Sequence, residues 1–363
     1  MGFASLRTAA FRNLADEEVD LRGKDIFLVG ENGQGKSNFL EALYFCSYGS
    51  SFRGARDRDL ARSGEKDFSA ALRLEGSLHE TVNLSYRDGK KAIHLDGKQI
   101  EDRKDLLQVA PSVIFSPDDM DFVSGSPERR RWFFDQTRSL WDPLYLEDLR
   151  RYRQVLKNRN AILRGGVYPP NPEVSATLEA LDLQLVRYGL ELSTKRQETA
   201  AQFSLVFESL YREISGLGGI GVQYRPSWKA NTVPELLRHL EERRGSDFTM
   251  GSSMSGPHRD RYLFTREERE FSPQASTGQR RLLALLLRIA QIRSYRERTG
   301  KNPVLLLDDV LLELDPAKRE KFLSVMPDYE QALYTFLPGE PYERYRSSDT
   351  MLYHVESGRL RVP

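Results

Sequence analysis

The hydrophobic pattern in the first third of the chain predicts short β-strands. Between residue 1 and about residue 115, apolar runs alternate with turn residues, and strand-like runs lie at residues 18–21, 26–29, 68–74, 81–86 and 92–95. Short apolar runs bounded by turn residues are typical of strands. Asp88-Gly89 separates the last two runs and is typical of a two-residue hairpin turn.

The middle of the chain has a helical pattern. After Pro127, apolar residues recur mostly every three or four positions, first from Tyr145 to Leu163 and then from Leu178 to Leu192. A helix cannot cross the prolines and glycines of the intervening segment RGGVYPPNPE, residues 164–173. We therefore expect an antiparallel helical hairpin. The heptad register is too short to indicate a long coiled coil.

The last part of the chain returns to a mixed α/β pattern. A loop rich in glycine and serine begins near residue 251, an apolar helix is expected at residues 281–292, and the run 303–307 has the pattern of a buried strand. A chain of 363 residues exceeds the size at which one core usually stops growing. We expect an α/β head made of residues 1–125 and 251–363, with a helical arm at residues 126–250.

Composition and charge exclude several classes of protein. The 54 basic and 53 acidic residues nearly cancel, so any nucleic-acid site has to be a local patch on a chain of net charge +1. The single cysteine, Cys46, can form neither an internal disulfide nor a cysteine metal cluster, which fits a reducing compartment. The sequence has no export signal and no apolar run long enough to span a membrane, so we expect a cytoplasmic protein.

The segment GENGQGKS, residues 30–37, has the pattern of a phosphate-binding loop and stands between an expected strand and an expected helix. In such a loop the glycines let backbone N–H groups point inward at phosphate oxygens, and the helix that follows adds its positive dipole end. Lys36 would reach the β- and γ-phosphates, and the Ser37 hydroxyl would ligate Mg²⁺. The backbone around the phosphates would come from Gly30, Glu31, Asn32, Gly33, Gln34 and Gly35. The alternative is a glycine-rich surface turn.

A carboxylate pair ends the apolar run VLLLDD, residues 304–309. Open α/β sheets place their ligands at the C-terminal ends of strands. Asp308 would hold Mg²⁺, directly or through water, and Asp309 would orient or deprotonate the water that attacks the γ-phosphate. The alternative for Asp309 is a structural or helix-capping carboxylate.

A second candidate anion loop precedes the apolar helix. Ser276, Gly278 and Gln279 belong to the sequence STGQ, and a loop of this kind at a helix N-terminus favours an anion. Two such loops far apart in one chain suggest that the second closes over a nucleotide held by another copy, so that ATP would act as a dimer clamp. Taken alone, STGQ is most often an ordinary helix cap.

The order of these three elements resembles that of the ATP-binding-cassette ATPases, with GENGQGKS as Walker A, STGQ as the signature loop and VLLLDD as Walker B. Leu314-Asp315 stands in the position of the D-loop, and Asp118 in the position of the Q-loop residue. A turn-capping role for Asp118 is equally open. The helical insertion is similar to the chromosome-maintenance branch. Four further segments resemble the RecF family: FRN at 11–13, GSSFR at 49–53, FSPDDMDFVSGSPERRRWFFD at 115–135 and SGPHRD at 255–260.

The resemblance to RecF implies an SMC-like P-loop ATPase head of α/β class with an inserted helical arm. It also implies weak, DNA-dependent ATP hydrolysis, ATP-dependent homodimerisation on DNA, and a role with RecO and RecR in loading the RecA recombinase at single-strand gaps. Two departures stand out. Thr335 lies where cassette ATPases often carry a histidine that senses the γ-phosphate, and Ala275 and Thr277 replace residues common in transporter signatures.

Three other groups of residues have both a functional and a structural explanation. Arg129-Arg130-Arg131 beside Trp132-Phe133-Phe134 is either a nucleic-acid patch or, more in keeping with helical geometry, a mixture of surface and core residues. His258 is assigned no chemistry, because a lone histidine is most often structural. A basic segment that either contacts DNA or is a solvated face contains Arg53, Arg56, Arg58 and Arg62.

Two other functions share parts of this pattern. A nucleotide-binding subunit of a different cassette ATPase would have the same nucleotide motifs without affinity for DNA. A DNA-binding scaffold with a vestigial nucleotide site would bind DNA whether or not Lys36 is intact.

Overall fold

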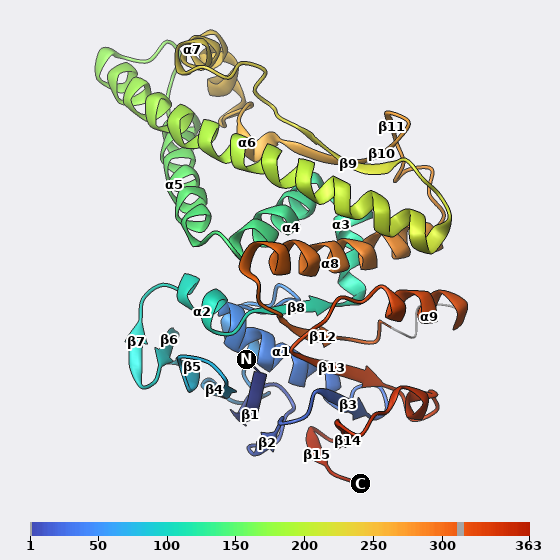
Figure 1. Ribbon diagram of the computed structural model, residues 1–363. Helices are drawn as coiled ribbons and strands as arrows, with labels where there is room; N and C mark the ends of the chain where they lie inside the picture. The colour runs from blue at the N-terminus through green and yellow to red at the C-terminus, as the bar shows by residue number, and fades with distance from the viewer. Residues whose placement is uncertain (1, 311–315) are drawn as a thin grey trace. The chain divides into compact units, whose positions relative to one another are not determined.

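The computed structural model describes residues 2–310 and 316–363, and the expected D-loop residues Leu314 and Asp315 lie outside these ranges (Figure 1). The chain forms two compact units: Met1–Asp119 with Leu285–Pro363, and Met120–Ala284. The sequence pattern suggested that the inserted unit ends at residue 250. In the structure it extends to Ala284, because β10 (Arg261–Arg266) pairs along its length with β9 (Ile220–Arg225) of the same unit.

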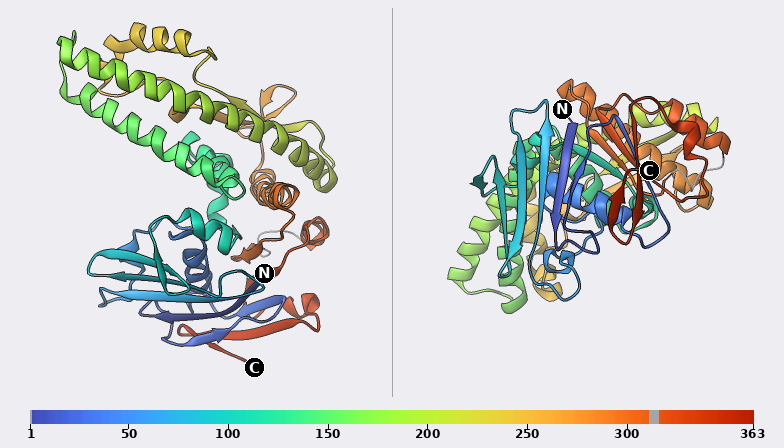
Figure 2. Two further views of the ribbon diagram at one scale, coloured as in Figure 1. Left: turned by 60° about the vertical axis from the view of Figure 1, so that its left-hand side comes forward. Right: turned by 90° about the horizontal axis from the view of Figure 1, so that it is seen from below.

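The first unit contains a sheet in which five neighbouring strands are parallel (Figure 2). Its strand order is β15 (Arg359–Arg361), β14 (Thr350–Glu356), β3 (Asp25–Val29), β13 (Gln331–Phe336), β12 (Val304–Leu307) and β8 (Ser112–Phe115). Every residue of β8, β12 and β13 is buried, which explains why these strands have continuous apolar runs without alternation.

The second sheet of this unit is antiparallel. Its strand order is β2 (Glu18–Asp20), β1 (Gly2–Ala9), β4 (Phe68–Glu75), β5 (Thr81–Arg87), β6 (Lys90–Leu95) and β7 (Lys98–Ile100). The predicted hairpin is confirmed, since β5 pairs with β6 and both turn residues have positive φ, 50° at Asp88 and 77° at Gly89. Helix α1 (Lys36–Tyr48) contacts strands of both sheets and is almost wholly buried.

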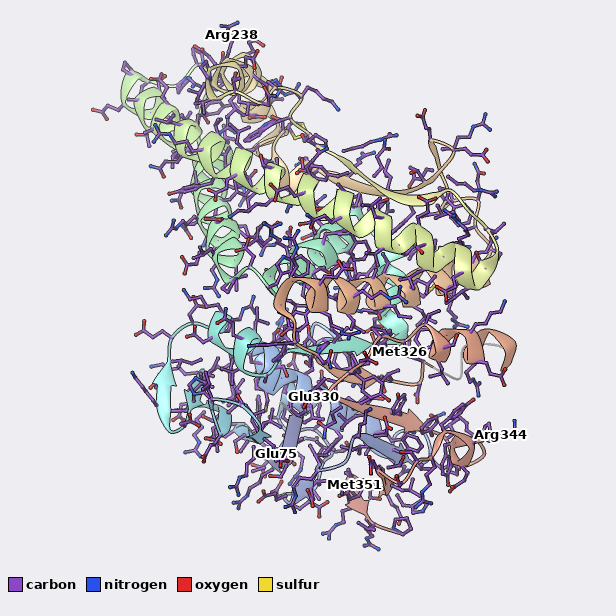
Figure 3. The ribbon with its side chains drawn as sticks, in the orientation of Figure 1. Glu75, Arg238, Met326, Glu330, Arg344 and Met351 are labelled. Atoms are coloured by element: carbon purple, nitrogen blue, oxygen red, sulfur yellow. The ribbon has the colours of Figure 1, made fainter. Side chains whose placement is uncertain are left out.

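One buried amide cross-links the two sheets. Gln331 directly follows Glu330, which is labelled in Figure 3, and it begins β13 of the parallel sheet. Its side chain accepts a hydrogen bond from the N–H of Phe3 on β1 at 3.0 Å and donates to the carbonyls of Phe3, Leu21 and Gly23 at 3.1, 2.5 and 2.9 Å. One side chain of the parallel layer therefore contacts four backbone groups of the antiparallel layer and its connection to β3, and the three carbonyls among them share its two N–H donors.

Helices make up most of the second unit. They are α3 (Met120–Ser124), α4 (Pro127–Ser139), α5 (Pro143–Gly165), α6 (Pro172–Ser215), α7 (Val233–Met250) and the start of α8 (Thr277–Thr299). Strands β9, β10 and β11 (Arg269–Glu270) form a small antiparallel sheet. The first unit adds α2 (Lys104–Val109), the rest of α8 and α9 (Pro316–Ser324). None of the helices in the described part of the chain is long and apolar enough to cross a bilayer.

The predicted helical hairpin is confirmed: α5 and α6 pack side by side through a buried apolar seam (Figures 1 and 2). Helix α6 runs for 44 residues, well beyond the periodic stretch that predicted it, and its second half covers β9. Trp228 packs so closely on the hairpin that a Cβ at Gly189 would lie 2.4 Å from its ring. Glycine is therefore required at this point of α6.

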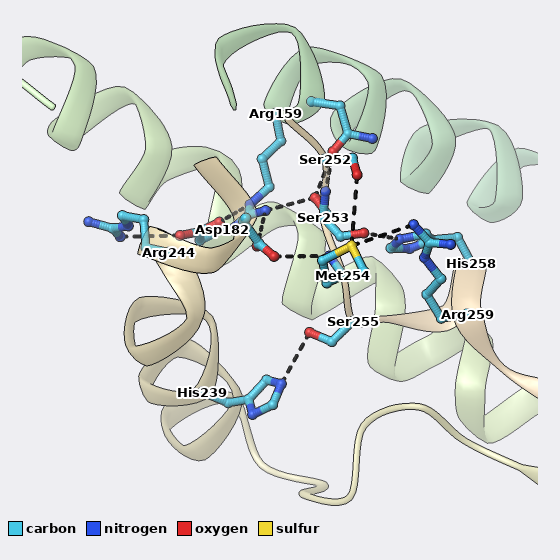
Figure 4. A network of polar contacts seen from close by, with 12 residues as sticks. Arg159, Asp182, His239, Arg244, Ser252, Ser253, Met254, Ser255, His258 and Arg259 are labelled. Atoms are coloured by element: carbon cyan, nitrogen blue, oxygen red, sulfur yellow. Dashed lines mark hydrogen bonds and ion pairs between the residues drawn. The ribbon is translucent and has the colours of Figure 1, made fainter. Parts of the chain in front are cut away.

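A network of polar side chains links α5, α6 and α7 (Figure 4). The fully buried Arg159 of α5 contacts Asp182 of α6 at 2.6 Å and Asp247 of α7 at 2.7 Å. Beside it, His258 of the SGPHRD segment has Nδ1 2.7 Å from the Tyr152 hydroxyl and Nε2 2.9 Å from the Ser253 carbonyl. Both ring nitrogens are thus used, in keeping with the structural role expected for His258.

Burial lowers the pKa of His258 to about 4, below its ordinary value of 6.5. Between these two pKa values the His258 side chain is protonated in the unfolded chain but neutral in the folded chain. The free energy of unfolding that is present above about pH 6.5 is therefore lost progressively as the pH falls towards 4. We expect the wild type to lose about 2 kcal/mol more unfolding free energy than His258→Gln between about pH 7.5 and 5.

Urea unfolding followed by tryptophan fluorescence measures this difference, since Trp132, Trp141 and Trp228, the three tryptophans of the chain, all lie in the second unit. His94→Gln, on β6 of the first unit, is the control for loss of a histidine. Equal pH dependence in the wild type and in His258→Gln would contradict the assignment.

Candidate nucleotide-binding site

The loop between β3 and α1 has the backbone of a phosphate cradle. Gly33 has φ of 80° and Gly35, the residue that precedes α1, has φ of 115°. Side chains rarely tolerate these values, so glycine is needed at both positions. Gly30 has a different reason to be glycine, since a Cβ there would lie 2.4 Å from the carbonyl oxygen of Val355. The glycines therefore let the loop curve tightly at the N-terminus of α1.

The turn between β14 and β15 holds this loop from outside. The N–H of Gly358 donates to the carbonyl of Gln34 at 2.8 Å, and the N–H of Ser357 donates to the Gln34 side chain at 2.7 Å. Gly358 has φ of 78°, and a Cβ on it would lie 1.8 Å from the carbonyl oxygen of Asn13. On the other side, the Asn13 side chain donates to the carbonyl of Gly33 at 3.2 Å. The loop is thus clamped between residues from both ends of the chain.

Lys36 and Ser37 begin α1 and point to different partners. The Lys36 ammonium is buried and donates to the carbonyls of Gly30 at 2.7 Å and Glu31 at 3.1 Å. The Ser37 hydroxyl donates to Asp308 Oδ1 at 2.6 Å, although the two residues are 271 positions apart in the sequence. The structure therefore brings together the two elements that the sequence predicted as partners.

The carboxylates follow β12 at the C-terminal edge of the parallel sheet. Asp308 is 5% exposed, and burial raises its pKa to about 6, while the Ser37 hydroxyl lowers it. Asp309 has φ of 52°, a left-handed conformation, and is held there by Thr335 on the neighbouring strand β13. The Thr335 hydroxyl accepts from the N–H of Asp309 at 2.7 Å and donates to Asp309 Oδ1 at 2.8 Å. Thr335, which stands where cassette ATPases often carry a histidine, therefore contacts Asp309 directly.

The donor set of this corner suits Mg²⁺. Ser37 and Asp308 offer a hydroxyl and a carboxylate in direct contact, and Mg²⁺ prefers oxygen ligands, usually one or two from protein with the rest from water and phosphate. A cation at these oxygens would also favour the ionised form of the buried Asp308. The residues present therefore fit the metal expected from the sequence.

An ion-pair network that the sequence pattern did not indicate lies behind the cradle. The carboxylate of Glu41 on α1 is fully buried and contacts the guanidinium of Arg12 at 3.0 Å and that of Arg53 at 3.7 Å. Arg53 also donates to the side chain of Asn38 at 2.9 Å and approaches Asp308 at 3.9 Å. The FRN and GSSFR segments, which are both part of the resemblance to RecF, therefore meet at α1.

Asp118 and Asp119 follow β8, which pairs with β12. Asp118 is exposed, whereas the buried Asp119 accepts from the N–H of Ser116 at 3.1 Å and pairs with Arg288 at 2.6 Å. The turn-capping role considered for Asp118 thus belongs to Asp119. The N–H of Asp308 donates to the carbonyl of Phe115, the last residue of β8, at 2.9 Å. Asp118 therefore lies just beyond the end of the strand that neighbours β12.

The STGQ segment begins α8 and lies in the second unit. The Ser276 hydroxyl accepts from the N–H of Gln279 at 3.2 Å, and the Gln279 side chain accepts from the N–H of Ser276 at 2.8 Å. This reciprocal pair is a capping box. Ser276, Thr277 and Gly278 are exposed. The local structure is therefore that of an ordinary capped helix with an accessible N-terminus.

The arginines considered as nucleic-acid contacts have separate roles in the structure. Arg130 and Arg131 donate to the carbonyls of Tyr262 and Asp260, which ties α4 to β10. Phe133 and Phe134 are buried, as expected for core residues. In the basic segment after α1, Arg58 and Arg62 pair with Asp59 and Asp16, and Arg53 joins the network around Glu41. These contacts favour the salt-bridged alternative for Arg58 and Arg62.

A parallel sheet with a glycine-rich loop after one strand and a carboxylate after another defines a P-loop protein, and the comparisons identify its class. A family model described as "RecF/RecN/SMC N terminal domain" matches residues 3–338. The "DNA replication and repair protein RecF" of Treponema pallidum (strain Nichols) is 43% identical over 352 residues, which cover 96% of this chain and 97% of that protein. The chain belongs to the RecF family.

Other relatives agree with this assignment. RecF of Leptospira interrogans serogroup Icterohaemorrhagiae serovar Lai (strain 56601) is 32% identical over 330 residues, covering 90% of this chain and 88% of that protein. A solved "recombination mediator protein RecF-ATP in RecFOR pathway" superimposes with a TM-score of 0.86 at 26% identity and covers 99% of this chain and 97% of its own. An Smc head bound to a domain of ScpA shares the fold, with a TM-score of 0.56 at 16% identity, 99% of this chain and 96% of its own.

Proposed function

We propose that the chain binds ATP with Mg²⁺ at the loop of residues 30–37. The observation that carries this proposal is the 2.6 Å contact between Ser37 and Asp308, because it joins the phosphate loop to the carboxylate strand at one edge of the sheet. The backbone N–H groups of the loop would surround the phosphates, and the Lys36 ammonium would neutralise the β- and γ-phosphates. Bound Mg²⁺ would neutralise phosphate charge, with Ser37 and Asp308 as its protein ligands.

Hydrolysis would depend on Asp309. Its carboxylate is held by Thr335 beside the buried Asp308, at the edge of the sheet where the γ-phosphate is expected. Asp309 would accept a proton from, or orient, the attacking water, and Asp118 would contact the water or the γ-phosphate from the end of β8. Weak, DNA-dependent turnover is the activity expected of this family.

ATP would also join two copies of the chain. The exposed N-terminus of α8, with Ser276, Gly278 and Gln279, offers N–H groups and a positive dipole end to the γ-phosphate held by another copy. Because the γ-phosphate would bridge the two heads, its hydrolysis would release them. ATP binding and dimerisation would then be a single event.

The biological role proposed here follows from family membership. A solved RecF that superimposes on this chain with a TM-score of 0.86 is called a recombination mediator in the RecFOR pathway. We infer that this chain is likewise a recombination mediator that dimerises on DNA with ATP bound. RecO and RecR would be its partners, and RecA would be loaded at single-strand gaps through them.

Ser276→Arg tests the dimer clamp. The longer, charged side chain would block the N-terminus of α8, so we expect the variant to bind ATP like the wild type but to remain monomeric with ATP in sedimentation-velocity runs. Retention of DNA, measured with ATP, ADP and a non-hydrolysable analogue, should be lost in parallel. The wild type should dimerise and retain DNA with ATP and with the analogue but not with ADP.

Ser126→Arg is the matched control, because Ser126 is the exposed N-cap of α4 in the same unit. It loses a helix cap and gains the same charge, and it should dimerise normally. A Ser276→Arg variant that dimerises like the wild type would contradict the clamp, and a wild type that retains DNA equally with no nucleotide would contradict the coupling of ATP to DNA.

Thr335→Val tests the positioning of Asp309. Valine has the shape of threonine but cannot hold the Asp309 carboxylate, so we expect kcat for ATP to fall by about tenfold to a hundredfold, with KM changed by less than about twofold. Thr335→Ser keeps the hydroxyl and should retain most of the turnover. A change in KM without a change in kcat, or equal loss in both variants, would argue against this role.

A further inference from the structure

Two arginines face each other across the small sheet of the second unit. Arg225 ends β9 and Arg261 begins β10, and the antiparallel register pairs them directly. Side chains at directly opposed positions share one face of the sheet and lie close enough to interact, and like charges placed in this way destabilise the pairing. Both residues are exposed. The chain therefore carries a repulsive pair on an open surface.

No carboxylate of the described residues relieves this repulsion. Within the part of the chain that the structure describes, neither arginine forms an ion pair, and the one hydrogen bond of the pair runs from Arg225 to the uncharged side chain of Gln223, at 2.9 Å. The nearest acidic residue in sequence, Asp260, is buried and is committed to Arg196, the Tyr224 hydroxyl and the N–H of Ser227. The two guanidinium groups thus keep most of their donors for a ligand.

The backbone that carries the pair is held firmly. The opposite face of β9 and β10 is buried: Tyr262 stacks on Phe134 of α4 with ring centroids 4.0 Å apart, and Tyr224 lies against Tyr262. Arg130 of α4 also donates to the Tyr262 carbonyl at 3.1 Å. Burial lowers the pKa of Arg130, Glu270 opposes this effect, and the positive charge of Arg261 lowers it further. Arg261 thus adds an unpaired positive charge beside Arg130, whose own charge is paired with Glu270 at 3.6 Å.

We propose that Arg225 and Arg261 form a binding site for phosphate groups of a DNA backbone. The inference rests on the proposed function, because it names the residues through which the second unit would contact DNA. Each guanidinium presents a planar fork of donors that matches a phosphate, and an anion between the forks would convert the repulsion into attraction.

The surroundings of the pair favour a phosphodiester backbone over an acidic protein surface. The same face of the sheet continues through the uncharged Gln223, Gly221 and Thr265 and through Leu263, which is 7% exposed. The one carboxylate on this face among the described strands, Glu270 of β11, lies opposite Thr265 and pairs with Arg130 at 3.6 Å. This face offers no exposed apolar anchor of the kind that dominates protein interfaces. Contacts made by charge and hydrogen bonds alone position a nucleic-acid backbone without reading its sequence.

The test is the salt dependence of duplex DNA binding by the double variant Arg225→Gln/Arg261→Gln of the full chain. Fluorescence anisotropy would be measured with a non-hydrolysable ATP analogue and Mg²⁺ at KCl concentrations between about 50 and 200 mM. Each phosphate contact contributes about −0.9 to the slope of log K against log salt, so the slope of the double variant should be less negative by about 2 for each copy of the chain on the DNA, whatever the DNA sequence.

The matched control is Arg187→Gln/Arg243→Gln, which removes two exposed arginines from helices α6 and α7 of the same unit. It should keep the wild-type slope. Melting temperature separates binding from folding: loss of a repulsive pair should leave it unchanged or raise it, whereas loss of a structural pair would lower it.

The outcomes separate this inference from the proposed function. A double variant that keeps the affinity and slope of the wild type overturns the phosphate site and leaves the surface to another partner, such as an acidic protein. A control pair that reduces the slope equally also overturns it, because the effect would then come from net charge. A wild type that does not bind DNA with the nucleotide present overturns both the proposed function and the inference.

Discussion

The structure depends on a short loop whose backbone N–H groups must point inward without support from a regular element. Such a conformation needs glycine at Gly33 and Gly35, and it loses the hydrogen bonds that a helix or strand would provide. The chain supplies this support from a distance. Gln34 is held by the turn at Ser357 and Gly358, and Gly33 by Asn13, so the two ends of the sequence converge on the loop.

The same need for preorganisation explains the carboxylate corner. Burial makes a carboxylate costly to ionise, and the raised pKa of Asp308 reflects this cost. The Ser37 hydroxyl offsets part of it, and Thr335 keeps Asp309 in a left-handed conformation that an aspartate seldom adopts. A metal ion bound beside Asp308 would offset the cost of this buried charge, and the carboxylates would already be in position before the phosphates bind.

Local chemistry in the sequence predicted much of the fold and the main parts of the site. Glycine spacing located the loop between β3 and α1, an apolar run ending in acids located β12, and helical periodicity located α5 and α6. These features follow from neighbouring residues, so one sequence suffices to find them. By contrast, nothing near Gln331 indicates that its amide would contact four backbone groups of another layer and its connection to β3. Glu41 and Gly358 were missed for the same reason, since their partners are remote in sequence.

Hydrophobic periodicity also cannot locate a domain boundary that depends on the pairing of strands. Residues 251–284 have the mixed pattern of the head, but β10 belongs with β9 and therefore with the inserted unit. Likewise, adjacent aspartates could not be ranked from sequence, and burial beside Arg288 is what distinguishes Asp119 from Asp118.

The central claim is that the clamped loop of residues 30–37 binds the phosphates of ATP. Isothermal titration calorimetry of ATP with Mg²⁺ into the purified chain tests it most directly, with Lys36→Met as the comparison. The account predicts saturable binding by the wild type, weakened by about tenfold or more when the Lys36 charge is removed, since a charge-assisted hydrogen bond contributes about 1.5–3 kcal/mol. A wild type that gives no binding heat with ATP and Mg²⁺, or a Lys36→Met variant with the same affinity, would contradict it.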